Sequence, residues 1–159
     1  MTLEEVMKSF VGRRGDVTIA RVDKSCIQRH IEAVGDMNPL WQDEEYAKSL
    51  GYSGMPAPPS FFGRNAKSGG EFPQLMMDMV IGFSSVGYPV MLDGGIEYEF
   101  YRPVYVGDTL ASVMSIDKAN HKMTKSGKGM VVVEYSTELL NQDGEKVAKC
   151  MMTLLCASL

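Results

Sequence analysis

The stretch GGIEYEFYRPVYVGD, residues 94–108, decides the fold class because apolar residues recur at every second position in its first half. This alternation is typical of a β-strand with one buried face and one wet face. The stretch therefore predicts a strand whose apolar side chains point into a core. The apolar members are Ile96, Tyr98 and Phe100, and the acidic members between them are Glu97 and Glu99.

The chain on either side of this stretch predicts four more strands. Alternating patterns indicate strands at about residues 109–117, 130–140 and 146–155. The last two are separated by residues 141–144, Asn-Gln-Asp-Gly, which is a hairpin signal. An earlier strand is expected at residues 17–22.

Between the early strand and residue 70 the apolar residues recur at helical spacing instead. The first predicted helix has Ser25 as its N-cap, with Gln28 at the capping-box position, and ends at Gly35 in the left-handed conformation. A second short helix is expected over residues 43–50, opened by Asp43. The apolar residues expected on one face of the first helix are Ile27, Ile31 and Val34.

Two more helices are predicted. One opens at Pro59 or Ser60 and runs through Ala66, because Pro fits the first position of a helix. The other lies within FPQLMMDMVIGF, residues 72–83. Helices followed by antiparallel strands indicate an α+β fold, with a curved five-stranded sheet wrapped around a central helix, for which the helix from Pro59 is the natural candidate. The sheet would keep an unpaired edge, so a dimer is expected.

Composition limits the class of protein. The 159 residues predict a single domain, 1–159, and 45% hydrophobic with 23% charged residues is typical of a globular protein. The net charge of −4 and the lack of a basic cluster argue against nucleic acid. Three cysteines match no metal spacing and indicate idle thiols, and the absence of a secretory signal or an apolar membrane span predicts a cytoplasmic protein.

Three segments in order resemble the MaoC-like dehydratases and hydratases of the hotdog fold. They are GDMNPLWQDEEYAKSLGYSGMPAPPSFF (35–62), LDGGIEYEFYRPVYVGDTL (92–110) and NQDGEKVAKC (141–150). The resemblance is closer to the non-catalytic branch named for the dehydratase region of fungal fatty-acid synthase, and it covers nearly the whole chain from Val17 onward. It implies addition or removal of water on an acyl thioester of coenzyme A or acyl carrier protein.

The resemblance also locates a catalytic slot. Active members read GD-x-N-P-x-H at this turn, and their Asp and His carry out the proton transfers. Here Asp36, Asn38 and Pro39 are in place, but Trp41 stands where the histidine should be. An indole nitrogen has no lone pair to act as a base. The remaining histidines, His30 and His121, are expected on the surface.

A substrate site is expected around this slot. The catalytic candidate is Asp36 alone, although Asp36 and Asn38 have an equally good explanation as turn formers and Trp41 as a core aromatic. Backbone N–H groups at the helix start could hold the thioester oxygen, as every helix start could. The substrate-binding candidates are Asn38, Trp41, Pro59, Ser60, Phe61, Phe62, Met76 and Met79, and the candidates for phosphates, or for solvated surface, are Arg64, Lys67 and Arg102.

The leading hypothesis is a subunit of a heteromeric 3-hydroxyacyl-thioester dehydratase or trans-2-enoyl-CoA hydratase. This chain would form the acyl pocket, and a MaoC-like partner subunit with an intact Asp–His pair would do the chemistry. Two alternatives stay open: a self-sufficient homodimeric hydratase that uses Asp36, and a non-catalytic acyl-CoA binding module. A thioesterase is disfavoured because SFFGRNAKSGG offers no carboxylate before Glu71. No cofactor and no metal site are predicted.

Overall fold

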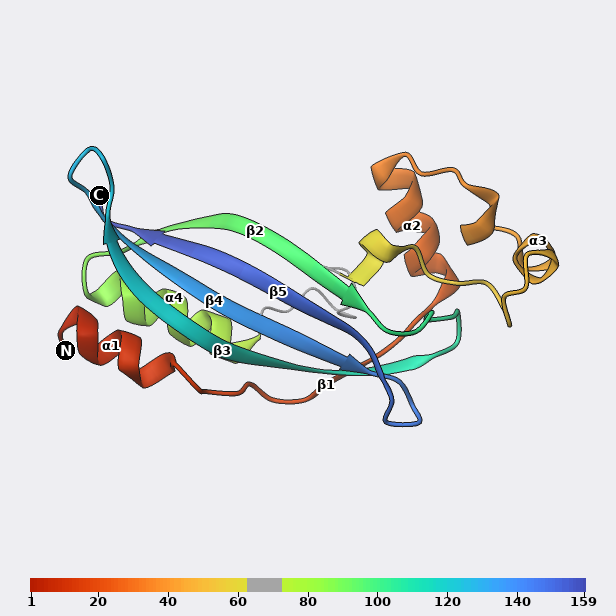
Figure 1. The fold of residues 1–159 in the computed structure, drawn as a ribbon, viewed down its shortest axis with the longest axis horizontal. Helices are drawn as coiled ribbons and strands as arrows, with labels where there is room; N and C mark the ends of the chain where they lie inside the picture. Colours follow the sequence, from red (N-terminus) through yellow and green to blue (C-terminus); the bar gives the residue numbers. More distant parts are fainter. Residues whose placement is uncertain (63–72) are drawn as a thin grey trace.

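The computed structural model describes residues 1–62 and 73–159, and its largest element is a curved antiparallel sheet (Figure 1). Its five strands lie in the order β1-β3-β4-β5-β2, so β1 and β2 form the two edges. The predicted strands are confirmed, and β3 continues beyond its predicted end. The strands are β1 Thr18–Arg21, β2 Val90–Phe100, β3 Thr109–Met123, β4 Gly129–Leu140 and β5 Lys146–Ala157.

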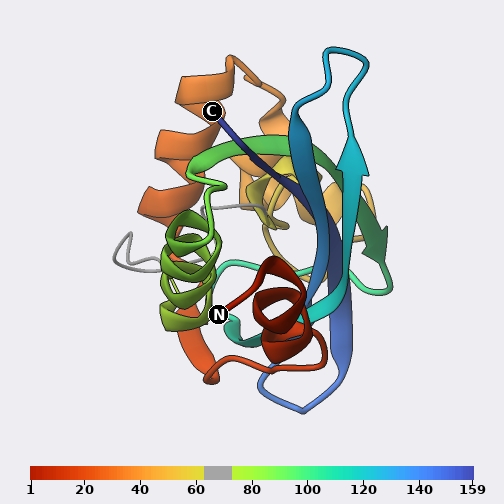
Figure 2. The same ribbon diagram turned by 90° about the vertical axis from the view of Figure 1, so that its left-hand side faces the viewer.

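Two helices, α1 (Leu3–Phe10) and α4 (Gln74–Ser85), pack side by side against one face of the sheet (Figures 1 and 2). They approach closely at Gly82, where an added Cβ would lie 2.7 Å from the ring of Phe10. We call the core beneath them the α4 cluster. Its buried residues are Val6, Phe10, Leu75, Met76, Met79, Phe83, Met114, Ile116, Val131, Val133, Tyr135, Leu154 and Cys156.

The helix predicted within residues 72–83 is therefore confirmed as α4, and it is the long helix that packs against the curved sheet. The helix predicted from Pro59 was the wrong choice for that role. Its described part is a single 3₁₀ turn, η2 (Pro59–Phe62), and the rest of the predicted range lies outside the described residues.

The remaining helical elements gather at the other end of the sheet (Figure 1). They are α2 (Lys24–Val34), the 3₁₀ turn η1 (Pro39–Trp41) and α3 (Glu44–Ser49), together with η2. They enclose a second core, which we call the α2 cluster. Its buried residues are Val22, Ile27, Ile31, Ala57, Phe61, Val104, Leu110, Leu139, Val147, Ala148 and Cys150.

The predicted helix boundaries are confirmed only in part. Gly35 follows α2 with φ 73°, and Asp43 caps α3 by accepting from the backbone N–H groups of Glu45 and Tyr46, both as predicted. The Ser25 cap is wrong, because the extended Asp23 holds the N-cap position, two residues earlier, and α2 begins at Lys24. Val34, expected on the same face as Ile27 and Ile31, is 55% exposed at the last position of α2.

Edge strand β2 keeps apolar side chains that the described residues cover only in part. Ile96 pairs with Met152 and Phe100 with Ala148, both on the side of β5 that faces the core. Yet Ile96 is 50% exposed and Phe100 47% exposed. The predicted alternation is correct, but the described residues bury this face only in part: Tyr98 packs against the α2 cluster, while Ile96 stays half exposed.

Candidate functional site

The turn after α2 is held together by the side chains of Asp36 and Asn38. Asp36 Oδ1 accepts a hydrogen bond from the backbone N–H of Asn38 at 3.2 Å, and Asn38 Oδ1 accepts from that of Leu40 at 3.0 Å. The Asn38 bond caps η1, which begins at Pro39. Both residues therefore stabilise the turn, which agrees with one of the two roles predicted for them.

Trp41 completes this turn by bonding to the same carboxylate. Its indole Nε1–H donates to Asp36 Oδ2 at 2.9 Å, and its half-buried ring packs against the α2 cluster. Trp41, at the position where the resemblance expects histidine, thus contacts the Asp36 carboxylate through its ring nitrogen. An indole N–H can only donate, whereas a neutral imidazole offers one donor and one acceptor. Asp36 and Trp41 therefore form a hydrogen-bonded pair in which the ring has no lone pair to accept a proton.

His30 is placed differently from the prediction. It was expected on the surface, but only 7% of it is exposed, and its Nε2 lies 2.8 Å from Ser60 Oγ. Its ring also meets the ring of Phe61 edge-on, with the centroids 5.8 Å apart. The sequence carried a signal for this: His30 lies three residues after Ile27, so the two side chains are neighbours on the helix surface. The reason for its burial is η2, which folds over that face from a distant part of the chain.

The predicted wall residues fall into two separate cores. Phe61, 3% exposed, belongs to the α2 cluster, while Met76 and Met79 belong to the α4 cluster. Met152 packs against both clusters. Pro59 and Ser60 are exposed, and the side chain of Phe62 lies outside the described part. That these residues form one acyl pocket therefore stays a prediction.

Of the charged residues predicted to bind phosphates, one forms a local ion pair and two lie outside the described residues. Arg102 forms an ion pair with Glu145 at 3.0 Å, while Arg64 and Lys67 lie outside the described residues. His121 is exposed, as expected; it lies within β3, and its Nε2 is hydrogen-bonded to the hydroxyl of Tyr88 at 2.9 Å.

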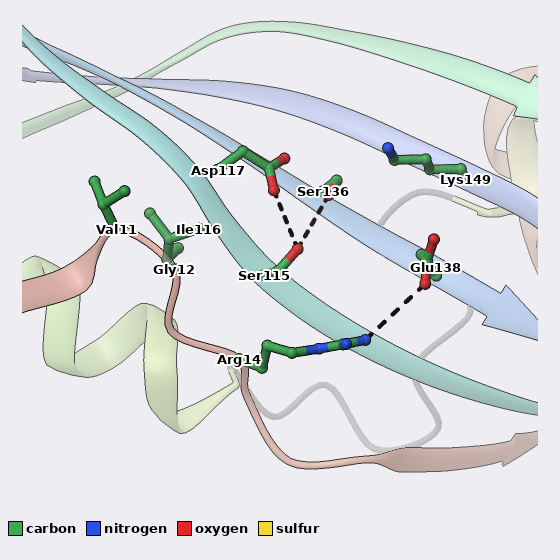
Figure 3. Close-up of a pocket in the computed structure, with 9 residues that line it drawn as sticks. All are labelled: Val11, Gly12, Arg14, Ser115, Ile116, Asp117, Ser136, Glu138 and Lys149. Carbon is green, nitrogen blue, oxygen red and sulfur yellow. Dashed lines mark hydrogen bonds and ion pairs between the residues drawn. The ribbon is translucent and has the colours of Figure 1, made fainter.

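A shallow groove of about 430 Å³ lies elsewhere, on the outer side of the sheet (Figure 3). Ser136 and Glu138 line it, and they alternate with Tyr135 and Leu139, which pack into the cores on the opposite face. Two basic and two acidic side chains balance its charge, and none of the predicted site residues takes part. The lining residues are Val11, Gly12, Arg14, Ser115, Ile116, Asp117, Ser136, Glu138 and Lys149.

The two cysteines of the cores are poor nucleophiles. Burial raises the pKa of the Cys150 thiol to about 11 and that of the Cys156 thiol to about 12. Across residues 1–62 and 73–159, His, Cys, Asp and Glu form no group that could hold a metal ion. None of the helices described is both long and apolar enough to cross a membrane.

Sequence comparison finds relatives along nearly the whole chain. The family model for the FAS1-like dehydratase domain region matches residues 9–150. A UPF0336 protein of Streptomyces avermitilis is 34% identical over 150 residues, which cover 93% of each chain. A probable enoyl-CoA hydratase alpha subunit of Thermomonospora curvata is 26% identical over 168 residues, which cover 96% of this chain and 51% of that protein.

Solved structures share the fold at low sequence identity. A chain of the ChsH1-ChsH2 complex from Mycobacterium tuberculosis has a TM-score of 0.81 at 20% identity, covering 98% of this chain and 93% of that one. A MaoC-like dehydratase has a TM-score of 0.73 at 21% identity, covering 96% and 43%. A chain of the HadBC (3R-hydroxyacyl-ACP dehydratase) complex from M. tuberculosis has a TM-score of 0.65 at 23% identity, covering 92% and 96%.

The match over residues 9–150, together with these relatives and the five-stranded sheet packed on α4, identifies the group to which the chain belongs. It is a member of the FAS1-like dehydratase region family and has the hotdog fold of the MaoC-like dehydratases.

Proposed function

We propose that this chain is the acyl-binding subunit of a heteromeric 3-hydroxyacyl-thioester dehydratase or trans-2-enoyl-CoA hydratase. A partner chain with an intact Asp–His pair carries out the proton transfers. The observation that carries the proposal is the hydrogen bond from Trp41 Nε1 to Asp36 Oδ2 at 2.9 Å. The slot is filled by a ring that can hold the carboxylate but cannot take a proton from water.

The relatives support a shared assembly. One relative is named as the alpha subunit of a probable enoyl-CoA hydratase, and two of the structural neighbours are chains of two-component complexes. Their low sequence identity to this chain supports a common fold, and the proposal extends that likeness to a two-component assembly.

The open edge of the sheet supports the same proposal on physical grounds. Unpaired backbone groups along β2, beside the exposed side chains of Ile96 and Phe100, form a surface that pairs readily with another strand. We expect the partner, or a second copy of this chain, to continue the sheet there. Covering these side chains removes apolar area from water and adds backbone hydrogen bonds.

The test compares the chain alone with the chain coexpressed with a MaoC-like protein from the same source that retains the histidine. We expect hydration of crotonyl and longer enoyl thioesters only from the copurified pair. Ile96→Lys should prevent copurification, whereas Val34→Lys, an equally exposed site on α2, should not. Brisk hydration by the purified chain alone would refute the proposal.

A further inference from the structure

His30 and Ser60 form a polar pair that the hydration chemistry does not use. His30 Nε2 and Ser60 Oγ are 2.8 Å apart, within the range in which a base activates a hydroxyl nucleophile. His30 is 7% exposed, while Ser60 is exposed. A buried imidazole is therefore hydrogen-bonded to the hydroxyl group of an exposed residue.

The imidazole is fixed in position by its surroundings. It lies between Ile27 and Ile31 on the inner face of α2, and the ring of Phe61 packs against it edge-on at an interplanar angle of 85°. These contacts restrict the rotation of the ring. A base that is already oriented toward its nucleophile needs no rearrangement when the reaction begins.

We propose that Ser60 and His30 act as a nucleophile and its base, through which this chain takes an acyl group from a thioester onto Ser60. The role requires the His30 tautomer with its proton on Nδ1, so that Nε2 has a lone pair to accept the Ser60 proton. This acyl-transfer activity goes beyond the proposed hydration. It shares with it only the class of substrate, an acyl thioester.

The reaction balances without any further reagent. Ser60 Oγ attacks the thioester carbon as its proton passes to His30 Nε2, so an O–C bond forms. The C–S bond then breaks, and the leaving thiolate takes the proton from His30, which leaves an ester on Ser60 and a free thiol. A water molecule can repeat the sequence, losing a proton to His30 while the proton returns to Ser60 Oγ, which releases the carboxylic acid.

The chain contains a matched control pair. Tyr88 and His121 also join a hydroxyl to a ring nitrogen, at 2.9 Å, but His121 is exposed and lies on strand β3. If proximity of a hydroxyl and an imidazole were sufficient, this pair would become acylated as readily as Ser60. If burial and orientation of the base matter, it would not.

The experiment uses the purified chain alone with p-nitrophenyl butyrate, and it needs neither a partner nor an enoyl thioester. Its failure is therefore distinct from a failure of the hydration proposal. We expect a burst of about one equivalent of p-nitrophenol, and a butyryl group located on Ser60 by mass spectrometry. Ser60→Ala should abolish the burst, and His30→Gln should slow acylation about 100-fold or more. His121→Gln should leave the rate unchanged.

Ser60→Cys keeps a nucleophile of similar size, so this variant should be acylated as well, which guards against a Ser60→Ala variant that folds poorly. An unlabelled Ser60 in the folded wild-type chain would overturn the proposal. So would labelling of Ser60 at the same rate in the folded His30→Gln variant. In either case the 2.8 Å bond would serve only to tie η2 to α2.

Discussion

Replacing Trp41 by histidine tests the slot on which the proposed function depends. The indole N–H donates to Asp36 Oδ2 at 2.9 Å, so an imidazole in the same place can keep that donor and bring a second nitrogen with a lone pair. General acid–base catalysis contributes about 10²–10⁴ in rate. We expect the Trp41→His chain to hydrate an enoyl thioester about that much faster than the unmodified chain does.

The substitution should leave the chain folded. Full burial of a large apolar side chain contributes about 1.5–3 kcal/mol, and Trp41 is half-buried at the edge of the α2 cluster. Exchanging the indole for the smaller imidazole should therefore cost about 1–2 kcal/mol. That is well below the roughly 5–15 kcal/mol by which a domain is usually stable, and the hydrogen bond to Asp36 is retained.

The assay follows the loss of the conjugated enoyl thioester, and a thermal melt of each variant verifies folding. Trp41→Phe is the matched control, because it changes the ring without supplying a base and should show no gain. Adding Asp36→Asn to the histidine variant should remove the gain. If the folded Trp41→His chain is no faster than the unmodified chain, then Asp36 and residue 41 are not a proton-relay position.

Three further predictions concern stability. Burial raises the pKa of Cys150 to about 11 and that of Cys156 to about 12, so these thiols lose their protons at lower pH in the unfolded chain than in the folded one. The free energy of unfolding, measured with urea, should therefore fall as pH rises above about 9. It should fall less in a variant in which both cysteines are replaced by alanine. Gly82→Ala should displace the ring of Phe10, 2.7 Å from the new Cβ, and speed amide exchange in α1; unchanged exchange would contradict this. Leu139→Ala, at a site that is 2% exposed, should cost about 2–5 kcal/mol of unfolding free energy, and a smaller loss in denaturant titration would mean that the α2 cluster collapses around the gap.

Local signals in the sequence predicted most of the fold. Alternation identified the long strands, and Gly35 ended α2 because its left-handed backbone, φ 73°, suits a residue without a side chain. The helix α1 was missed even though its capping box was readable: Thr2 and Glu5 bond to each other's backbone N–H groups at the start of an apolar helix. The helix from Pro59 was chosen for the centre of the sheet, whereas α4 packs there, because local signals do not show which helix packs on the sheet.

The site was harder to predict because its decisive contacts join distant segments. The bond between Asp36 and Trp41 spans five positions within one turn, so a motif could indicate it. The contact between His30 and Ser60 spans 30 positions. Helical periodicity alone could have placed His30 on the inner face of α2, but nothing local shows that η2 folds over that face. The burial of His30 depends on long-range packing, and its predicted place on the surface was therefore wrong.

The open edge of strand β2 also affects how long a newly made chain survives. A copy of the chain without its proposed partner presents unpaired backbone groups beside exposed apolar side chains such as that of Ile96, the combination that favours aggregation and that chaperones and proteases act upon. Under the proposed function, copies made in excess over the partner would therefore be short-lived, and the amount of this chain in the cell would be set by how much of the partner is present.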